Sequence, residues 1–312
     1  MELLEVASDV FAVLQEDLGW GWNNAGFVAT GAGMMVDTFI DVKHTREALA
    51  LYAEKGPRPH QLVNTHHNID HCWGNQLFGD AEIIAHRQCA ERMAKDFTPD
   101  SLIAILEQPD PSPGVAWFAA DLKEFDFAEV EKTLPNRLLD GDTQIEVGGT
   151  AAEILYLGPA HTAGDVVVYL PEKGVVFAGD LIFRQCTPIG WEGTTAGWVS
   201  ALERIAALAP ETIVPGHGPL CGVEGALEMR DYLQYVYDES KRFYEQELPA
   251  EEAAKRIDLG PYADWTQPER VVFNVDRVYR ELRGGAWDEA VEIMRLLDSA
   301  RALGLEREAA RS

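Results

Sequence analysis

Thr65-His66-His67-Asn68-Ile69-Asp70-His71 is the most informative stretch of this chain of 312 residues. Three histidines and an aspartate follow directly on residues 61–64, a short run that predicts a buried strand ending in a turn. Imidazole nitrogens and carboxylate oxygens are favoured ligands of Zn²⁺ and Fe²⁺, and such a turn can hold several of them together. The stretch therefore predicts a metal site. We do not expect His67 to bind, because adjacent side chains in extended backbone point opposite ways.

Three further segments place similar side chains beside predicted strands. His161 stands in a loop rich in glycine and proline, Asp180 follows Phe-Ala-Gly at the end of a strand, and His217 stands between two glycines after another strand. Side chains at strand ends can converge from distant parts of a chain, so we expect these three to join the first cluster. The remaining histidines have no such context and are expected to be surface or core residues: His44, His60 and His86.

Strand patterns fall into two groups, within residues 6–85 and 143–214, and helical patterns follow each group. This grouping favours a layered αββα architecture over a doubly wound sheet. The four segments, in their order, resemble the motifs of the metallo-β-lactamase superfamily, which begin with His-x-His-x-Asp-His and continue with a histidine, a bridging aspartate and a final histidine. The resemblance covers roughly residues 5–220. It implies the αβ/βα sandwich of that family, with the metal site at one edge and a C-terminal helical extension beyond it.

The chain departs from the family motif at Asn68, which stands in the place of the second histidine. By resemblance, the first metal site would hold His66, His161 and a share of Asp180. The carbonyl oxygen of an asparagine is neutral and a weaker ligand than imidazole for a borderline metal. Whether or not Asn68 binds, we expect unequal sites for one or two Zn²⁺ ions, of which the first is the weaker.

The second metal site keeps its complete set of ligands. The resemblance assigns Asp70, His71 and His217 to it, and Asp180 would bridge the two ions of a dinuclear centre. Asp37 follows an apolar strand and matches a position that the family often uses as a structural support near the site. These assignments imply that the second ion is held more firmly than the first.

The chemistry follows from the metal, because a bound divalent ion lowers the pKa of its water towards about 7 and polarises a carbonyl group. We expect a hydrolase in which metal-bound hydroxide attacks an ester, thioester, lactone or amide of a small molecule, with Asp70 and Asp180 as catalytic residues. The alternative is a di-iron or mixed-metal oxidoreductase on the same fold, since iron also accepts these ligands. No flavin-binding segment or C-x-x-C pair supports that alternative.

The composition of the chain indicates which partners and which cellular compartment to expect. Lys and Arg number 26 against 52 Asp and Glu, so the net charge of −26 disfavours binding to nucleic acid. No apolar run approaches the roughly 18–20 residues that span a bilayer, and residues 1–5 do not resemble a secretory signal. The four cysteines are scattered, as expected of free thiols. We expect a cytoplasmic protein with a small-molecule substrate and no membrane partner.

Two domains are expected. Residues 1–221 would form the metallo-β-lactamase-like domain, and residues 222–312, in which helical patterns recur, would form a helical cap packed on the core and a candidate face for a homodimer. Residues 19–24 and 188–193 are rich in glycine and tryptophan. They either form an apolar wall of the substrate pocket, over which the cap closes, or are ordinary core and surface loops.

Overall fold

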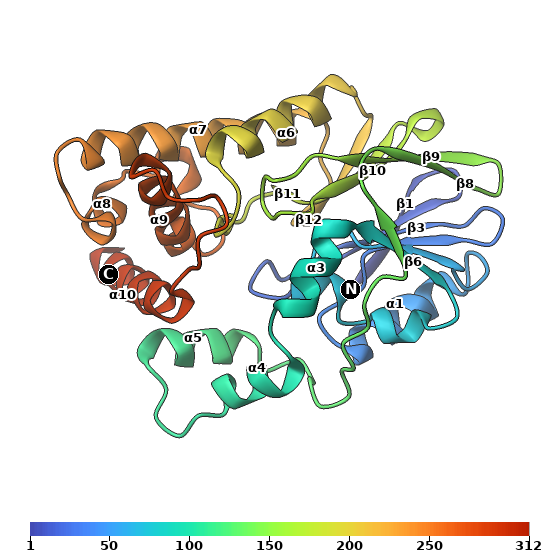
Figure 1. The fold of residues 1–312 in the computed structure, drawn as a ribbon, viewed down its shortest axis with the longest axis horizontal. Helices are drawn as coiled ribbons and strands as arrows, with labels where there is room; N and C mark the ends of the chain where they lie inside the picture. Colours follow the sequence, from blue (N-terminus) through green and yellow to red (C-terminus); the bar gives the residue numbers. More distant parts are fainter. Residues whose placement is uncertain (312) are drawn as a thin grey trace.

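Two β-sheets lie face to face in the computed structural model, which describes residues 1–311, and helices cover the outer faces of the sheets (Figure 1). The first sheet has seven strands in the order β1-β2-β3-β4-β5-β6-β7, and the second has five in the order β12-β11-β10-β9-β8. The chain therefore adopts the αββα sandwich that the two groups of strand patterns predict.

The first sheet is antiparallel from β1 to β4 and parallel from β4 to β7. Parallel neighbours end at the same edge of a sheet, so the residues that follow β4 and β5 meet there. The strands are β1 (Glu2–Ala7), β2 (Val10–Leu14), β3 (Ala25–Val28), β4 (Met34–Val36), β5 (Gln61–Val63), β6 (Glu82–His86) and β7 (Arg137–Leu139). The helices of this half are α1 (Val42–Tyr52), α2 (Ile69–Cys72), η1 (Asn75–Phe78), α3 (Arg87–Lys95), α4 (Pro99–Leu106) and α5 (Pro113–Asp121).

The second sheet is antiparallel except for its last pair, β11 and β12, which run parallel. Helices α6 and α7 contact β11 on the outer face of this sheet. The elements are β8 (Thr143–Val147), β9 (Thr150–Tyr156), β10 (Val166–Leu170), η2 (Pro171–Lys173), β11 (Val175–Phe183), α6 (Thr195–Ala207) and β12 (Thr212–His217).

Apolar side chains of both sheets meet in the layer between them. Val28 and Val36 of the first sheet share one buried cluster with Val168 and Phe177 of the second. The approach is close, because a Cβ atom placed on Gly26 would lie 2.2 Å from Cε1 of Phe177. The sheets are therefore fixed against each other at the end where the predicted ligands lie.

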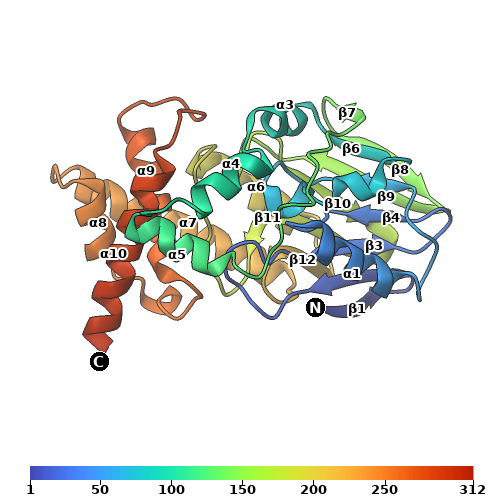
Figure 2. The ribbon, with the colours of Figure 1, turned by 90° about the horizontal axis from the view of Figure 1, so that it is seen from below.

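Helices form the rest of the described chain and gather at one end of the molecule (Figure 1). Helix α7 runs along α6, and α10 lies beside α5 of the first half (Figure 2). None of the helices within residues 1–311 combines the length and the apolar character needed to cross a bilayer. The elements are α7 (Val223–Tyr244), α8 (Ala250–Arg256), η3 (Gly260–Tyr262), η4 (Pro268–Arg270), α9 (Val271–Leu282) and α10 (Ile293–Arg311).

The strand that carries Asp180 differs from the sequence-based prediction. The strand does not end at this aspartate but continues to Phe183, and its register with β12 shifts around Gly179. Gly179 has a φ of +52°, and a Cβ atom there would lie 2.4 Å from Oγ1 of Thr65. Only glycine fits this bulge without strain, and the bulge turns the Asp180 side chain towards the turn after β5.

Candidate metal centre

The turn after β5 is held by side chains that are not themselves ligand candidates. Asn64 donates from Nδ2 to the carbonyl oxygen of His71 at 3.1 Å and to Oδ1 of Asn75 at 3.0 Å. Asn68 has extended backbone angles and precedes α2, which carries the next two predicted ligands. The short strand, the turn and the short helix therefore present their polar side chains from a fixed backbone.

Asp37 follows β4 with a φ of +59° and supports this turn. Its Oδ1 accepts from the backbone N–H of Thr65 at 2.7 Å, and its Oδ2 accepts from the Thr65 hydroxyl at 2.7 Å. The same Oδ2 lies 2.9 Å from Nδ1 of His71. This contact fixes the His71 ring, so that Nε2 faces the centre. The structure therefore gives Asp37 the supporting position that the family resemblance implies.

Asp180 stands between two groups of ligand-type side chains. In the first group, its Oδ2 lies 3.6 Å from Nε2 of His66 and 3.4 Å from Nε2 of His161. The ligand atoms of these three residues all lie within 4.8 Å of one another, which is close enough to share one metal ion. The structure thus brings the three residues of the predicted first site together from the turn after β5, from β11 and from the loop before β10.

The second group faces Oδ1, the other oxygen of the Asp180 carboxylate. Oδ1 of Asp180 is 3.0 Å from Nε2 of His71 and 3.4 Å from Nε2 of His217. Nε2 of His217 also lies 3.4 Å from Oδ2 of Asp70, and the ligand atoms of Asp70, His71 and His217 lie within 4.8 Å of one another. The Nδ1 of His217 is 3.1 Å from the carbonyl oxygen of Trp22, which leaves Nε2 for the centre.

The donor atoms fit a metal ion, because several are buried without a hydrogen-bond partner. Nε2 of His66, Nε2 of His71 and Oδ1 of Asp180 make no hydrogen bond of good geometry within residues 1–311, although the last two atoms lie 3.0 Å apart. Each buried polar atom left unpaired costs about 1–3 kcal/mol, so a cluster of them indicates a ligand. A third grouping, of Asp37 with His66 and His71, has its carboxylate already engaged in hydrogen bonds.

The charges of the centre agree with this interpretation. Burial opposes protonation of His71, yet Asp180, Asp70 and Asp37 raise its pKa well above 6.5. Burial acts against protonation of His217 as well, but Asp180 and Asp70 raise its pKa to about 9. Burial alone would raise the pKa of Asp180, whereas the neighbouring histidines hold it well below 3.8. The buried carboxylates thus require positive charge, which either protons or a divalent cation can supply.

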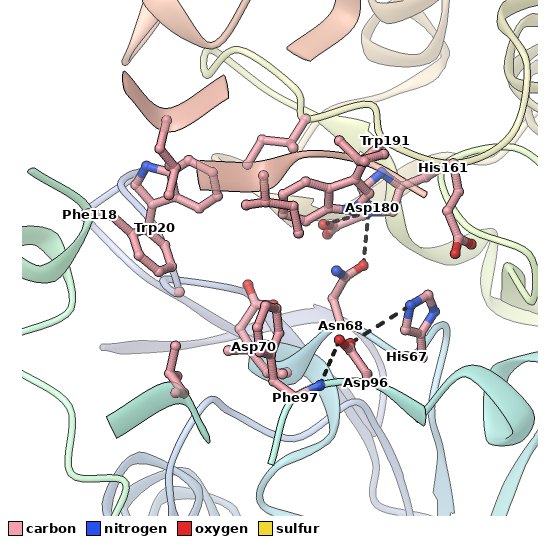
Figure 3. Close-up of a pocket in the computed structure, with 18 of the residues that line it drawn as sticks. Trp20, His67, Asn68, Asp70, Asp96, Phe97, Phe118, His161, Asp180 and Trp191 are labelled. Atoms are coloured by element: carbon pink, nitrogen blue, oxygen red, sulfur yellow. Dashed lines mark hydrogen bonds and ion pairs between the residues drawn. The ribbon is translucent and has the colours of Figure 1, made fainter. Parts of the chain in front are cut away.

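Asn68 faces the first group. Its Oδ1 lies 3.1 Å from Nε2 of His161, the contact that is drawn between their side chains in Figure 3. The amide therefore stands beside His161, one of the histidines of the first group. His67, by contrast, lies outside the three groups, with Nε2 3.9 Å from Oδ2 of Asp96. Burial and the charge of His66 lower the pKa of His67 to about 3.

A cavity of about 340 Å³ opens onto the centre. Asp70, His161, Asp180 and His217 line its base, and aromatic side chains form much of its wall (Figure 3). Both loops rich in glycine and tryptophan contribute to it, residues 19–21 from the first and Ile189, Trp191 and Glu192 from the second. Trp22 of the first loop instead packs on Phe125, at 4.7 Å between ring centroids.

Sequence reasoning missed two further parts of the wall. Helices α4 and α5 supply Leu102, Ile105 and Phe118, whereas the prolines of residues 97–135 predict only loops and short helices there, without a role in the site. Thr98 and Ser112, each followed by proline at the first helical position, were the available signal for both helices. Arg270 also lines the cavity, from the end of η4. It carries no sequence motif, because tertiary packing alone brings it there.

An αββα sandwich with two groups of histidines and aspartates at one edge defines a metal-binding class of proteins. The model of the family described as the metallo-beta-lactamase superfamily matches residues 18–217. The chain belongs to the metallo-beta-lactamase superfamily.

Individual relatives are more distant. A hydroxyacylglutathione hydrolase of Maricaulis maris is 31% identical over 155 residues, which are 49% of this chain and 45% of the relative. A linear primary-alkylsulfatase of Pseudomonas sp. is 24% identical over 259 residues, 73% of this chain and 48% of the relative. This chain thus spans about half the length of these curated relatives. A solved metallo-beta-lactamase family protein of Thermus thermophilus shares the fold, with a TM-score of 0.64 and 21% identity over 90% of this chain and 95% of that protein.

Proposed function

We propose that this protein is a metal-dependent hydrolase that cleaves an ester, thioester, lactone or amide of a small molecule. The observation that carries the proposal is the position of Asp180, whose two carboxylate oxygens face the two groups of ligand-type residues separately. The hydrolase names of the relatives support it. Zn²⁺ is the proposed ion, because nitrogen and oxygen ligands of this kind suit it.

The residues of the centre have separable roles in this reaction. His66, His161 and Asp180 would hold one ion, and Asp70, His71 and His217 with Asp180 would hold the other. A divalent ion held there supplies an activated water and polarises the bond to be cleaved. In this proposal Asp70, which lines the cavity and has its Oδ2 3.4 Å from Nε2 of His217, would also accept a proton during the reaction. The apolar wall excludes bulk water from the reacting group.

The two sites are unequal in this proposal. Asn68 contributes a neutral amide oxygen to the first site, where imidazole would bind a borderline metal more strongly. The second site has a full set of charged or imidazole ligands, and its histidines are held at Nδ1 by Asp37 and by the carbonyl of Trp22. We therefore propose that the second site fills first and that the first site fills only at higher Zn²⁺ concentration.

A second candidate reaction is the hydrolysis of an alkyl sulfate ester. The match to the alkylsulfatase extends over 73% of this chain, against 49% for the hydroxyacylglutathione hydrolase. The cavity also offers an apolar wall to an alkyl chain, with side chains such as Leu102, Ile105 and Phe118. Thioester and sulfate ester substrates place different atoms at the metals, so turnover distinguishes them directly.

The test is a substrate screen on the zinc-loaded protein, with thioesters, lactones, aryl esters and alkyl sulfates assayed in parallel. Asp180→Ala, prepared and loaded identically, is the negative control. Turnover of one class that is lost in the variant supports the proposal. Iron with visible charge-transfer bands in protein purified without added metal, together with no hydrolysis, would instead favour the oxidoreductase.

The remaining expectations concern organisation and partners. We propose that residues 222–312 act as a helical cap on the domain formed by residues 1–221, and that the protein is cytoplasmic and takes a small molecule rather than nucleic acid. The helical tail remains a candidate homodimer face. Light scattering of the purified protein measures its oligomeric state, and cell fractionation measures its compartment.

A further inference from the structure

A buried arginine without an anionic partner lines the cavity. Arg270 is only 1% exposed, and its Nε and Nη2 make no hydrogen bond within residues 1–311. Burial lowers the pKa of this guanidinium, but arginine keeps its charge at neutral pH. A buried charge without a partner costs several kcal/mol, so its presence requires an explanation in terms of a ligand or a packing role.

Packing accounts for one face of the group. Cζ of Arg270 lies 4.6 Å from the centroid of the Trp20 ring, and Trp20 is itself part of the cavity wall. Such a contact stabilises the flat face of the guanidinium but leaves its N–H groups, which lie in the plane, without acceptors. The in-plane N–H groups are the ones that recognise carboxylates and sulfates.

A shortage of acidic residues does not explain the unpaired charge. The chain has 52 acidic against 26 basic residues, and the other arginine of the cavity is paired. Arg92 lies 3.4 Å from Glu192 and 3.3 Å from Asp288 through its Nε and Nη2. The negative charges that act on Arg270 include Asp121, Glu269 and Asp70, and none of the three forms an ion pair with it within the described residues.

We propose that Arg270 binds an oxyanion of the substrate, a carboxylate or a sulfate, and that the substrate is therefore an anion with an apolar body. The inference rests on the proposed function, because the same cavity leads to the metal centre. The apolar body lies against the wall formed by residues such as Trp20, Phe118 and Trp191. Arg270 is thus the residue that determines specificity for charge.

The test is a binding measurement that does not need turnover. The zinc-loaded protein is titrated with octanoate, octane-1-sulfonate and 1-octanol, and tryptophan fluorescence reports binding near Trp20 and Trp191. The wild-type protein should bind at least one of the anions roughly 10- to 100-fold more tightly than 1-octanol, the difference typical of hydrogen bonds to a charged group. The arm that binds identifies the oxyanion as carboxylate or sulfate. Equal affinity for all three probes overturns the proposal.

Three variants separate the anion site from a packing role and from the metals. Arg270→Met should abolish the preference for the anion, and Arg270→Lys should retain part of it, because the charge remains without the planar fork. Arg277→Met is the matched control. Arg277 is buried on α9, the helix that begins directly after Arg270, with its guanidinium 5.0 Å from the Trp198 ring, but it does not line the cavity. A preference that survives in Arg270→Met shows that the metals alone bind the anion and overturns the proposal.

The outcomes also separate this inference from the proposed reaction. If the anion binds in a way that depends on Arg270 but no ester or sulfate is hydrolysed, the anion site is supported and the proposed hydrolase activity is refuted. Hydrolysis with the same kcat/KM for anionic substrates in the wild type and in Arg270→Met removes the anion site and leaves the hydrolase. If Arg270→Met does not fold, the lysine variant and the wild-type comparison with 1-octanol decide the matter.

Discussion

Oδ1 of Asn68 lies 3.1 Å from Nε2 of His161, so an amide oxygen faces the first group of ligand-type residues. The contact is a hydrogen bond in this structure, with the imidazole N–H donating to the amide oxygen. A metal ion at the first site would require that proton to leave Nε2. With no ion bound, the asparagine therefore favours the His161 tautomer that is protonated at Nε2.

Asn68→His should tighten binding of the weaker Zn²⁺ ion by at least about tenfold, because an imidazole replaces a neutral amide. Calorimetric titration of chelated protein with Zn²⁺ measures both ions in one experiment. Asn68→Ala is the control, and it should leave the tighter ion unchanged, since Asn68 faces only the first group. Two indistinguishable tight sites in the wild type would contradict the unequal centre.

Asp180→Ala should lose the weaker ion entirely and reduce turnover on the order of 100-fold or more. The carboxylate faces both groups, so no neighbouring residue replaces it. Metal content by mass spectrometry and the steady-state rate are measured on the same preparation. A variant that keeps both its metal content and its turnover would show that Asp180 is not the shared ligand.

Asp37→Asn should weaken metal binding at the second site by about 10- to 100-fold, as expected for a group that orients a ligating histidine. The asparagine side chain is neutral. Its oxygen therefore accepts hydrogen bonds from the Thr65 hydroxyl and from Nδ1 of His71 more weakly than the Asp37 carboxylate does. Asp41→Asn is a matched control, because Asp41 is equally buried and contacts Nδ1 of His44, away from the centre. The control should lower the free energy of unfolding without changing metal affinity.

The stability of the protein should depend on pH through Asp165. Burial raises the pKa of this carboxyl from 3.8 to about 6, against the hydrogen bonds that it accepts from Thr162. The folded state thus holds this proton more tightly than the unfolded chain. The contribution to stability is present below about pH 4 and is lost as pH rises through about 6.

Asp165→Asn removes this dependence. Between about pH 4 and pH 7, the free energy of unfolding of the wild type should fall relative to that of the variant by an amount on the order of 2 kcal/mol. Urea denaturation at a series of pH values measures it. A difference that stays constant over this interval would show that Asp165 is ionised in the folded protein throughout.

Local sequence patterns predicted the regular elements well. The two groups of strand patterns predicted within residues 6–85 and 143–214 each supply strands of one sheet, because apolar periodicity and flanking turns agree there. Asp180 was expected at the end of a strand, directly after Phe177-Ala178-Gly179. In the structure the glycine forms a bulge within the strand, and a contact with Thr65 that is distant in sequence determines this.

More residues of the candidate metal centre than of the cavity above it could be predicted from the sequence. Histidines and aspartates carry a recognisable pattern of spacing, and the structure brings together all seven residues that this pattern selected. Arg270 and Phe118 carry none, because a single arginine or phenylalanine has no local signature. Their positions depend on how η4 and α5 pack against the sheets, which only the assembled structure shows.

The loop after β2 is joined to the loop that carries the last histidine. Nδ2 of Asn24 donates to the carbonyl oxygens of Pro215 at 2.9 Å and Gly218 at 2.8 Å, and Trp22 contacts His217 across 195 residues of sequence. Contacts of such high sequence separation close a long loop at a cost in entropy, and topologies rich in them fold slowly. His217 therefore reaches its place only when both halves of the sandwich have assembled. Uptake of the metal would then report completed folding, and a truncated or half-folded chain would be unable to retain it.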